Sequence, residues 1–299
     1  MKKKLQGSLS LLLATVIWGG AFVAQSAGMD LIGPFTFQAI RCLLAVLSLF
    51  LVITVLEIRN LRQSILKWAD KQLWKAGVVC GCALFVSTSL QQVGLVETDA
   101  GKAGFITAMY IVIVPIFGLF LRKKPSPAAV FSVFVAVVGM YLLCGVGVAK
   151  ISTGDLLILG CAVAFAVQIT LIDRFAPNVD ALRLNCIQSL VVAVLSCIPM
   201  FATETPRIDN ILNCWLPLVY AGVLSMGVAY TLQIIGQRHL EPTAASLIMS
   251  LESVFAVVFG ALLLHETMTV WETTGCILVF IAVILSQVHI PKSSKVALS

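Results

Sequence analysis

Ten long apolar stretches recur along the chain, and they restrict the fold more than any other feature of the sequence. Each is close to the roughly 20 residues that a helix needs to cross the hydrocarbon core of a bilayer. Helix is the expected form, because backbone groups in lipid must pair within a segment and the alternation typical of a barrel is absent. The sequence therefore predicts an all-α membrane protein with ten transmembrane helices. The stretches cover approximately residues 8–27, 34–56, 73–94, 100–121, 128–147, 154–173, 181–201, 213–236, 242–264 and 269–289.

Composition agrees with a chain immersed in lipid, since 60% of the residues are hydrophobic, 11% are charged and the mean hydropathy is +1.03. Ordinary soluble domains do not reach such values. The nine cysteines lie mostly inside apolar stretches and are expected as small buried side chains rather than as a disulfide framework. Cys80 and Cys82 have no further metal ligands nearby, so neither a metal nor a cofactor is expected.

Basic residues predict the orientation, because sixteen of the twenty Lys and Arg residues fall on one side of the predicted membrane. The positive-inside rule assigns that side to the cytoplasm, and ten crossings then place both termini there, with residues 290–299 as a short tail. The other side carries Lys102, Lys150 and Arg207, and Arg41 lies within a helix. The basic side holds Lys2, Lys3, Lys4, Arg59, Arg62, Lys67, Lys71, Lys75, Arg122, Lys123, Lys124, Arg174, Arg183, Arg238, Lys292 and Lys295.

This distribution also bears on partners and on location. The basic residues sit beside apolar stretches instead of forming one patch, so no nucleic-acid partner is expected for the net charge of +6. Membrane lipid is the expected surrounding, and the short tails without an organelle signal suit a multi-pass protein of a bacterial inner membrane. The start, MKKKLQGSLSLLLATVIWGG, could also be interpreted as a signal peptide; we favour a retained helix because an equivalent helix recurs later in the chain.

The chain consists of two similar halves, which we place at residues 8–147 and 153–289. The first helices match less closely than the later ones, and there a shift of 147 residues superposes Gly7 on Gly154, Val16 on Val163 and Trp18 on Phe165. In the later helices a shift of 142 residues superposes Leu90 on Leu232, Gln91 on Gln233, Gly94 on Gly236, Asp99 on Glu241, Ala103 on Ala245, Ile106 on Ile248, Phe117 on Phe259 and Gly118 on Gly260.

Five helices in each half impose an inverted arrangement, because after an odd number of crossings the second half enters the membrane from the opposite side. Two similar units in opposite orientations can exchange conformations, so that inward-open and outward-open forms differ little in free energy. The sequence therefore predicts two inverted five-helix repeats, with a substrate site between them near the middle of the membrane.

Several segments also resemble a known family: WGGAFVAQ from Trp18, FQAIRCLLA with its arginine, SLQQVGL before a helix start rich in small residues, and SLESVFAVVFGALLLHE with Glu252 and Glu266. With the five-plus-five topology, they are similar to the EamA family of the drug/metabolite transporter superfamily, over roughly residues 8–144 and 153–288. The resemblance implies permeases for small solutes, many of them exporters of amino acids or other metabolites, with a central cavity lined by both repeats.

Two charged residues inside predicted helices, Arg41 and Glu252, need partners or water, since a charge at membrane depth costs at least about 2.5–3.5 kcal/mol. At 1.5 Å per residue, Arg41 lies about 10 Å from the outer edge and Glu252 about 15 Å from the inner edge, so their depths nearly coincide in a core about 30 Å thick. We expect Glu252 to point into the bundle, with Arg41 as its counter-charge. A structural pair, a cavity wall that contacts substrate or a coupling proton, and a carboxylate that reaches water alone all remain open for Glu252.

The other candidate cavity residues are polar or aromatic groups inside helices, where each could line the cavity or join neighbouring helices. Trp18 lies in mid-helix, away from the interface where tryptophans usually anchor. Pro115 could kink its helix and act in gating, and Gly77 and Gly81 form a G-x-x-x-G pattern typical of close helix contact. With Arg41 and Glu252, the complete set of predicted cavity residues comprises Trp18, Gln25, Gln38, Arg41, Gln91, Tyr110, Gln168, Gln233 and Glu252.

The hypothesis drawn from these features is a secondary-active permease that exports amino acids or related small metabolites. Uptake, nucleotide-sugar exchange and multidrug efflux are the transport alternatives, and an intramembrane enzyme or a scaffold is the alternative outside transport. The segment GLVETDAGKA lacks the glycine spacing and the Ser or Thr of a P-loop, so direct use of ATP is not expected. No catalytic pair or soluble domain indicates an enzyme, and the short loops offer little surface for a required protein partner.

The inverted arrangement can be tested by cysteine labelling in intact cells. Cysteines placed at residues 122–124 are expected to react only after the membrane is made permeable, whereas cysteines at 204–207 are expected to react from outside. Labelling of both groups from the same face would contradict the two inverted repeats.

Overall fold

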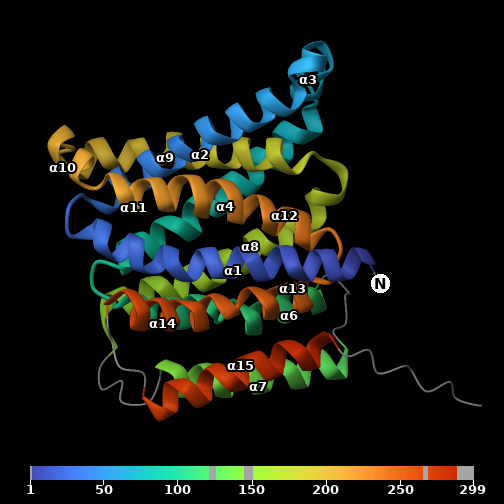
Figure 1. The fold of residues 1–299 in the computed structure, drawn as a ribbon, viewed down its shortest axis with the longest axis vertical. Coiled ribbons are helices and arrows are strands. Elements are labelled where there is room, and N and C mark those ends of the chain that lie inside the picture. The colour runs from blue at the N-terminus through green and yellow to red at the C-terminus, as the bar shows by residue number, and fades with distance from the viewer. Residues whose placement is uncertain (1, 121–125, 145–150, 265–268, 288–299) are drawn as a thin grey trace, which may run out of the picture.

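The computed structural model describes residues 2–120, 126–144, 151–264 and 269–287, and its regular elements are all helices. The basic loop 122–124, Glu266 and the predicted tail 290–299 lie outside the described residues. Figure 1 shows the long helices running side by side, with α3 at one corner of the bundle.

Eight helical stretches of the described chain are long and apolar enough to cross a membrane. These stretches are Lys2–Met29, Pro34–Asn60, Lys71–Gly94, Ala100–Phe120, Thr153–Asn178, Ala181–Thr203, Trp215–Gln237 and Pro242–Leu263. Each overlaps one of the ten predicted apolar stretches. The other two stretches correspond to shorter apolar helices, Pro127–Leu142 and Val270–Ser286, so ten crossings stay a prediction.

Most spans are single α-helices, and three are built from successive elements. The single helices are α1 (Lys2–Met29), α2 (Pro34–Glu57), α4 (Lys71–Gly94), α7 (Pro127–Cys144), α8 (Thr153–Phe175), α9 (Ala181–Thr203) and α15 (Val270–Gln287). The composite spans are α5 (Ala100–Ala108) with α6 (Tyr110–Phe120), α13 (Pro242–Met249) with α14 (Leu251–Leu264), and α11 (Trp215–Val219) with η3 (Tyr220–Ala229) and α12 (Tyr230–Gln237). The segment η3 is a π-helix, a rare form that often occurs at functional sites.

Local sequence signals explain where several helices begin. Pro34 and Pro242 stand in the first turns of α2 and α13, where the missing N–H of proline has no cost. Asp70 caps α4 through the backbone N–H of Gln72, and Ser152 and Asp155 form a capping box at the start of α8. The short connecting helices are α3 (Leu61–Trp68) and α10 (Ile208–Asn213), together with the 3-10 turns η1 (Ile58–Asn60) and η2 (Ala176–Asn178).

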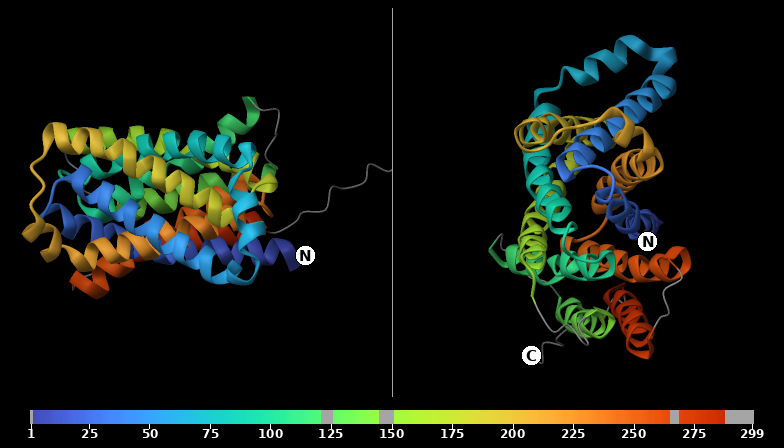
Figure 2. Two further views of the ribbon diagram at one scale, coloured as in Figure 1. Left: turned by 90° about the horizontal axis from the view of Figure 1, so that it is seen from above. Right: turned by 90° about the vertical axis from the view of Figure 1, so that its left-hand side faces the viewer.

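The bundle has two distinct edges, which both views of the ribbon show (Figures 1 and 2). The helices α2 and α9 pack along each other at one edge, and α7 and α15 pack along each other at the opposite edge. Between them, α1 contacts α12, α14 and η3, while α8 contacts α4, α5 and α6. A large cluster of buried apolar residues fills this central part, from Leu11 and Trp18 on α1 to Ala282 on α15.

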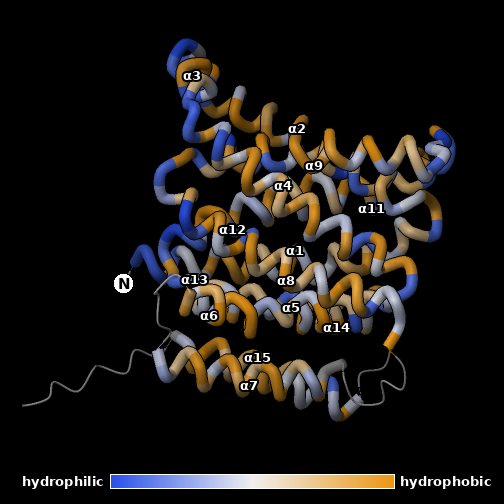
Figure 3. The backbone as a smooth tube through the Cα atoms, turned by 180° about the vertical axis from the view of Figure 1, so that it is seen from behind, coloured by the Kyte–Doolittle hydropathy of each residue, from blue (hydrophilic) through white to orange (hydrophobic). Residues whose placement is uncertain are grey.

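The outer surface of the helices is apolar, as expected for a protein whose solvent is lipid. Figure 3 shows hydrophobic colour along the helices and hydrophilic colour mainly at their ends. Large exposed side chains include Leu47 and Phe50 on α2 and Phe131 and Phe134 on α7. Their exposure would be unfavourable in water and is favourable against acyl chains.

The G-x-x-x-G pattern marks the close approach of α4 to α9. A Cβ atom added at Gly81 would lie 2.7 Å from the Cβ of Val191, and one at Gly77 would collide with Ile187. The predicted helix contact at these glycines is therefore confirmed.

Substitution of Gly81 by alanine is expected to lower the free energy of unfolding by about 1–3 kcal/mol, because the branched Val191 side chain cannot easily move aside. Gly160→Ala is the matched control, since its added Cβ would meet Leu90 at an ordinary 3.5 Å. Thermal unfolding in detergent measures both changes. Equal stability of the two variants would contradict the close contact.

Candidate functional site

A cavity lies between helices of both halves of the chain. The centres of water molecules can occupy about 30 Å³ of this cavity. A few waters fit in such a space, whereas a metabolite requires the walls to move apart. The lining residues are Trp18, Ala21, Phe22, Gln25, Arg41, Gln91, Tyr110, Phe165, Ile169, Ser225, Met226, Tyr230, Gln233, Met249 and Glu252.

Arg41 brings a positive charge to this cavity from α2. Its side chain is only 2% exposed, and its Nη1 donates a hydrogen bond to Oε1 of Gln25 on α1. The Nε2 of Gln25 donates in turn to the carbonyl oxygen of Ala21 at 3.0 Å, so the amide orientation is fixed. The guanidinium also lies 5.7 Å from the centroid of the Phe37 ring, within the range of a cation–π contact. These contacts hold the buried arginine in a defined position.

Glu252 brings a carboxyl group to the same cavity from the first turn of α14. It is 6% exposed, and its Oε1 accepts a hydrogen bond of 2.9 Å from the hydroxyl of Tyr110 on α6. A helix N-terminus favours a negative charge, so its position in the first turn also suits a carboxylate. Tyr110 and Glu252 are separated by 142 residues, the shift that superposes the later helices of the two halves.

The prediction that Arg41 is the counter-charge of Glu252 is wrong. Within the described residues no ion pair or hydrogen bond joins them, because Gln25 is the partner of Arg41 and Tyr110 is the partner of Glu252. Their similar depth was estimated from the helix rise, which gives no information about where two helices stand around the bundle. Both residues nevertheless line one cavity.

Two glutamines line the cavity from equivalent positions of the two halves. Gln91 donates to the hydroxyl of Thr107 at 3.2 Å, and Gln233 donates to the amide oxygen of Gln168 at 3.2 Å. The amide oxygen of Gln233 is buried and has no hydrogen-bond partner within the described part of the chain. It is therefore available to accept a hydrogen bond from a bound solute.

Trp18 places its ring against Tyr230 in the cavity wall. The ring centroids lie 5.0 Å apart with the planes at 65°, an edge-to-face contact. The indole N–H is buried and lacks a hydrogen-bond partner among the described residues. Because an unpaired buried donor is costly, this group is a second place where a polar solute could bind.

Seven of the nine predicted cavity residues line the cavity, and Gln38 and Gln168 do not. Gln38 donates to the hydroxyls of Ser89 and Ser196, at 2.9 and 3.0 Å, and so joins α2 to α4 and α9. Gln168 supports Gln233 from behind the wall. Pro115 lies within α6, away from the lining residues, and its role in gating stays a prediction, as does substrate contact by the seven.

Most of the lining residues missed by sequence reasoning are apolar or aromatic. Phe165 could have been found, because the shift of 147 residues places it opposite Trp18, whereas Ile169 lies opposite Phe22, which was itself missed. Met226 and Met249 gave no signal, since an apolar residue facing a cavity looks the same in sequence as one facing lipid. Ser225 and Met226 belong to the π-helical segment, which no sequence pattern indicated.

Four pairs of lining residues occupy positions that the sequence shifts make equivalent. They are Trp18 with Phe165, Phe22 with Ile169, Gln91 with Gln233, and Tyr110 with Glu252. The cavity is thus formed by corresponding surfaces of the two halves. No group of three potential metal ligands occurs in the part of the chain that the structure describes.

A model of the EamA-like transporter family matches residues 5–145 and 152–287. The chain belongs to the EamA-like transporter family. An uncharacterized transporter of Archaeoglobus fulgidus is 32% identical to this family member over 289 residues, which cover 96% of this chain and 88% of that protein. The uncharacterized transporter YoaV of Bacillus subtilis is 22% identical, and the match covers 91% of this chain and 93% of YoaV.

A solved crystal structure is similar to this EamA-family chain with a TM-score of 0.75, covering 94% of this chain and 96% of the other. At 18% identity this likeness shows the fold alone. Together with the membrane-spanning helices, the family identifies a multi-pass membrane protein of a transporter family rather than an enzyme family, consistent with a bacterial inner membrane.

The contact between Tyr110 and Glu252 predicts a specific effect on stability. Tyr110→Phe removes only the hydroxyl, and the free energy of unfolding is expected to fall by about 1–3 kcal/mol because a buried carboxyl oxygen loses its donor. Tyr141→Phe on α7 is the control, since Tyr141 is 57% exposed. Thermal unfolding of both variants is the measurement, and a loss of stability no larger for Tyr110→Phe than for the control would argue against the contact.

Proposed function

We propose that this protein is a secondary-active permease that exports amino acids or related small metabolites by alternating access through the cavity. The observation that carries the proposal is a cavity between the two halves, with a buried arginine and a buried glutamate in its wall. The substrate is a small molecule, and the surroundings are membrane lipid. A proton is a candidate coupling ion, because Glu252 can bind one at the cavity wall.

Ten crossings as two inverted repeats, with both termini in the cytoplasm, are part of this proposal. The packing supports it, because corresponding segments meet each other: α2 packs on α9, and α7 packs on α15. The remaining contacts also occur in corresponding sets, since α8 packs on α4, α5 and α6 as α1 packs on η3, α12, α13 and α14. The family model matches two ranges, 5–145 and 152–287, close to the proposed repeats 8–147 and 153–289.

Interrupted helices provide further support for a transport site. The fourth span of each half is interrupted once, at Met109 in the first half and at Ser250 in the second. Tyr110 is the first residue after the interruption at Met109, Glu252 is the second residue after the one at Ser250, and both line the cavity. Discontinuous helices near a site between inverted repeats are typical of secondary transporters, where they allow the walls to rearrange.

The cavity chemistry favours a substrate that carries both charges. The guanidinium of Arg41 suits a carboxylate, and the carboxyl group of Glu252 suits an ammonium group. The two do not neutralise each other directly, so a zwitterion could contact both. Uptake, nucleotide-sugar exchange and multidrug efflux are the transport alternatives. An intramembrane enzyme or a scaffold is the alternative outside transport, and neither would move solute.

Counterflow in proteoliposomes tests the proposal. The purified protein is expected to accumulate a labelled amino acid when vesicles are preloaded with the unlabelled compound, and purines and cationic drugs serve as competing solute classes. Movement of none of these classes by folded protein would contradict the permease. A rate that responds only to purines or drugs would contradict the amino-acid assignment while leaving transport in place.

Arg41→Ala and Glu252→Gln are expected to lower the counterflow rate at least about tenfold, which corresponds to about 1.4 kcal/mol of lost interaction. Glu272→Gln is the matched control, because Glu272 caps the start of α15 away from the cavity and its variant should retain the wild-type rate. The amount of folded protein is measured beside the rate. Normal transport in both cavity variants would remove these residues from the mechanism.

A further inference from the structure

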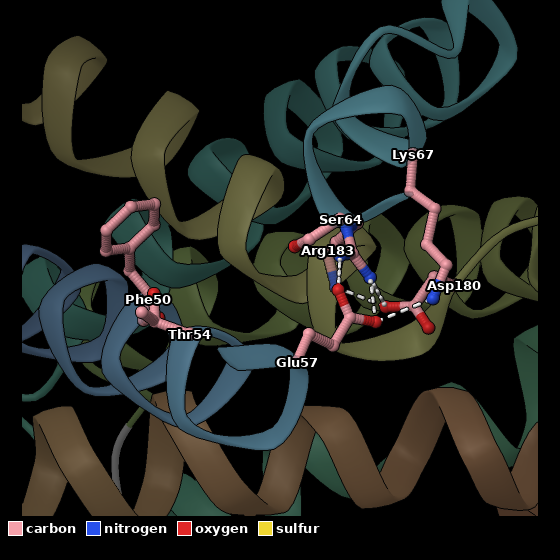
Figure 4. Close-up of polar contacts among 7 residues, drawn as sticks. All are labelled: Phe50, Thr54, Glu57, Ser64, Lys67, Asp180 and Arg183. Atoms are coloured by element: carbon pink, nitrogen blue, oxygen red, sulfur yellow. Dashed lines mark hydrogen bonds and ion pairs between the residues drawn. The ribbon is translucent and has the colours of Figure 1, made fainter. Parts of the chain in front are cut away.

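A buried arginine network ties the end of α2 to the start of α9. Glu57, the last residue of α2, accepts hydrogen bonds from Nη1 and Nη2 of Arg183, the former at 3.3 Å. Arg183 is 1% exposed, and its Nη2 also donates to Ser64 of α3 at 3.0 Å. Lys67 adds a second cation to Glu57 at 2.6 Å (Figure 4). We call the contact between Glu57 and Arg183 the inner clasp.

A second carboxylate ties the same two helices at their other ends. Glu204, the residue directly after α9, accepts hydrogen bonds from the backbone N–H groups of Phe35 and Thr36, each at 2.8 Å. The hydroxyl of Thr36 donates to the same carboxylate at 2.5 Å. All these donors lie in the first turn of α2, whose N–H groups have no partners within the helix. We call this contact the outer clasp.

The two clasps occupy equivalent positions of the repeats. The shift of 147 residues that superposes Gly7 on Gly154 also places Glu57 on Glu204 and Thr36 on Arg183. In each half, a glutamate at the end of the second span therefore contacts the third residue of the second span of the other half. This correspondence distinguishes the clasps from incidental surface contacts.

Different residues before the two helices explain why the partners differ. Gly33 precedes α2 and has no side chain to cap it, and a Cβ atom there would collide with the carboxylate of Glu204. Asp180 precedes α9 and caps that helix itself by accepting from the backbone N–H of Arg183 at 2.9 Å. Because Asp180 already caps the start of α9, Glu57 binds the side chain of Arg183 instead of the backbone N–H groups.

The clasped helices lie to one side of the cavity. No residue of α9 lines it, and Arg41 is the single lining residue of α2. Between the clasps the pair is packed continuously, through Gln38 with Ser196 and through an apolar cluster that contains Leu49 and Cys186. The two helices are therefore in contact at both ends and between them, an arrangement that would let the other cavity walls move relative to the pair as one unit.

We infer that Glu57 and Glu204 are positioning residues that hold α2 and α9 together at both membrane faces throughout the transport cycle, so that the pair is a fixed pivot. This inference rests on the proposed function. In the opposite arrangement the clasps would be gates, with one open whenever the cavity faces its side of the membrane. A covalent link across a clasp preserves transport if the pair is a fixed pivot and stops transport if the clasp is a gate.

The test replaces each clasp by a covalent link. One variant carries Thr36→Cys with Glu204→Cys and another carries Glu57→Cys with Arg183→Cys, in a background with Cys82→Ser and Cys197→Ser. Bis-methanethiosulfonate reagents of matched length join the cysteines, and counterflow of the solute transported by the wild type is measured before and after. We expect each unlinked variant to be at least about threefold slower than the background, and linking to restore the rate to within about twofold.

Several results would overturn the inference. Loss of transport on linking either clasp, in protein that transports before linking, would identify gates. Failure of both pairs to link in folded protein would show that the ends are not adjacent. The background protein treated with the same reagent controls for its remaining cysteines, and a wild type that moves no solute would contradict the proposed function itself. Lys67→Ala, which removes the exposed partner of Glu57, should transport at nearly the wild-type rate.

A second measurement keeps the inference testable if the double variants do not fold. Spin labels at Ile58→Cys and Asn178→Cys, both exposed positions near the inner clasp, report the separation of the ends of α2 and α9. A fixed pivot gives one distance, unchanged by saturating solute. Two distances whose populations shift with solute would identify a gate.

Discussion

The hydrocarbon core of the membrane offers no hydrogen-bond partners, and the rest of this structure depends on that constraint. Backbone groups must pair within each segment, which explains why the described elements are all helices. Polar side chains must find partners inside the bundle, which explains why Arg41, Glu252 and the cavity glutamines face its interior while the outer surface carries apolar side chains such as Leu47 and Phe131. The same rule that builds the fold therefore also gathers the groups available for binding a solute.

This rule determines how much could be predicted from the sequence. The spans were predictable because lipid requires long apolar runs. The polar lining was largely predictable because a glutamine or arginine inside such a run is costly against lipid and therefore faces the interior of the bundle. Tyr230 and Met226 were not predictable, since lipid-facing and cavity-facing apolar residues obey the same pattern. The interruptions at Met109 and Ser250 and the π-helical segment lie inside apolar runs, where a hydropathy pattern carries no signal for them.

The error over Arg41 and Glu252 has a similar origin. Helix rise locates a residue along the membrane normal, but the position around the bundle depends on which helices are neighbours. In the proposed inverted arrangement, the repeats supply part of this missing information, since residues near the axis that would relate the two halves meet their own counterparts. Tyr110 and Glu252 are such counterparts, and the tyrosine provides the contact that a search for opposite charges assigned to Arg41. Comparing the halves is therefore a better guide to contacts at the centre of such a protein than matching charges by depth.

If the repeats are inverted as proposed, the two clasps lie at opposite membrane faces, and these faces impose different chemistry on equivalent positions. In the proposed orientation, Arg183 stands on the cytoplasmic side, where basic residues are favoured, and Thr36 stands outside, where they are disfavoured. An arginine at position 36 would oppose that orientation, so the outer glutamate is held by neutral donors, the N–H groups and hydroxyl at the start of α2. A glutamate suits both places because acidic residues contribute little to orientation. Both repeats therefore have the glutamate, and they differ in the groups that bind it. In the proposed orientation, α2 and α9 are thus joined at both ends without an additional basic residue on the outer side of the membrane.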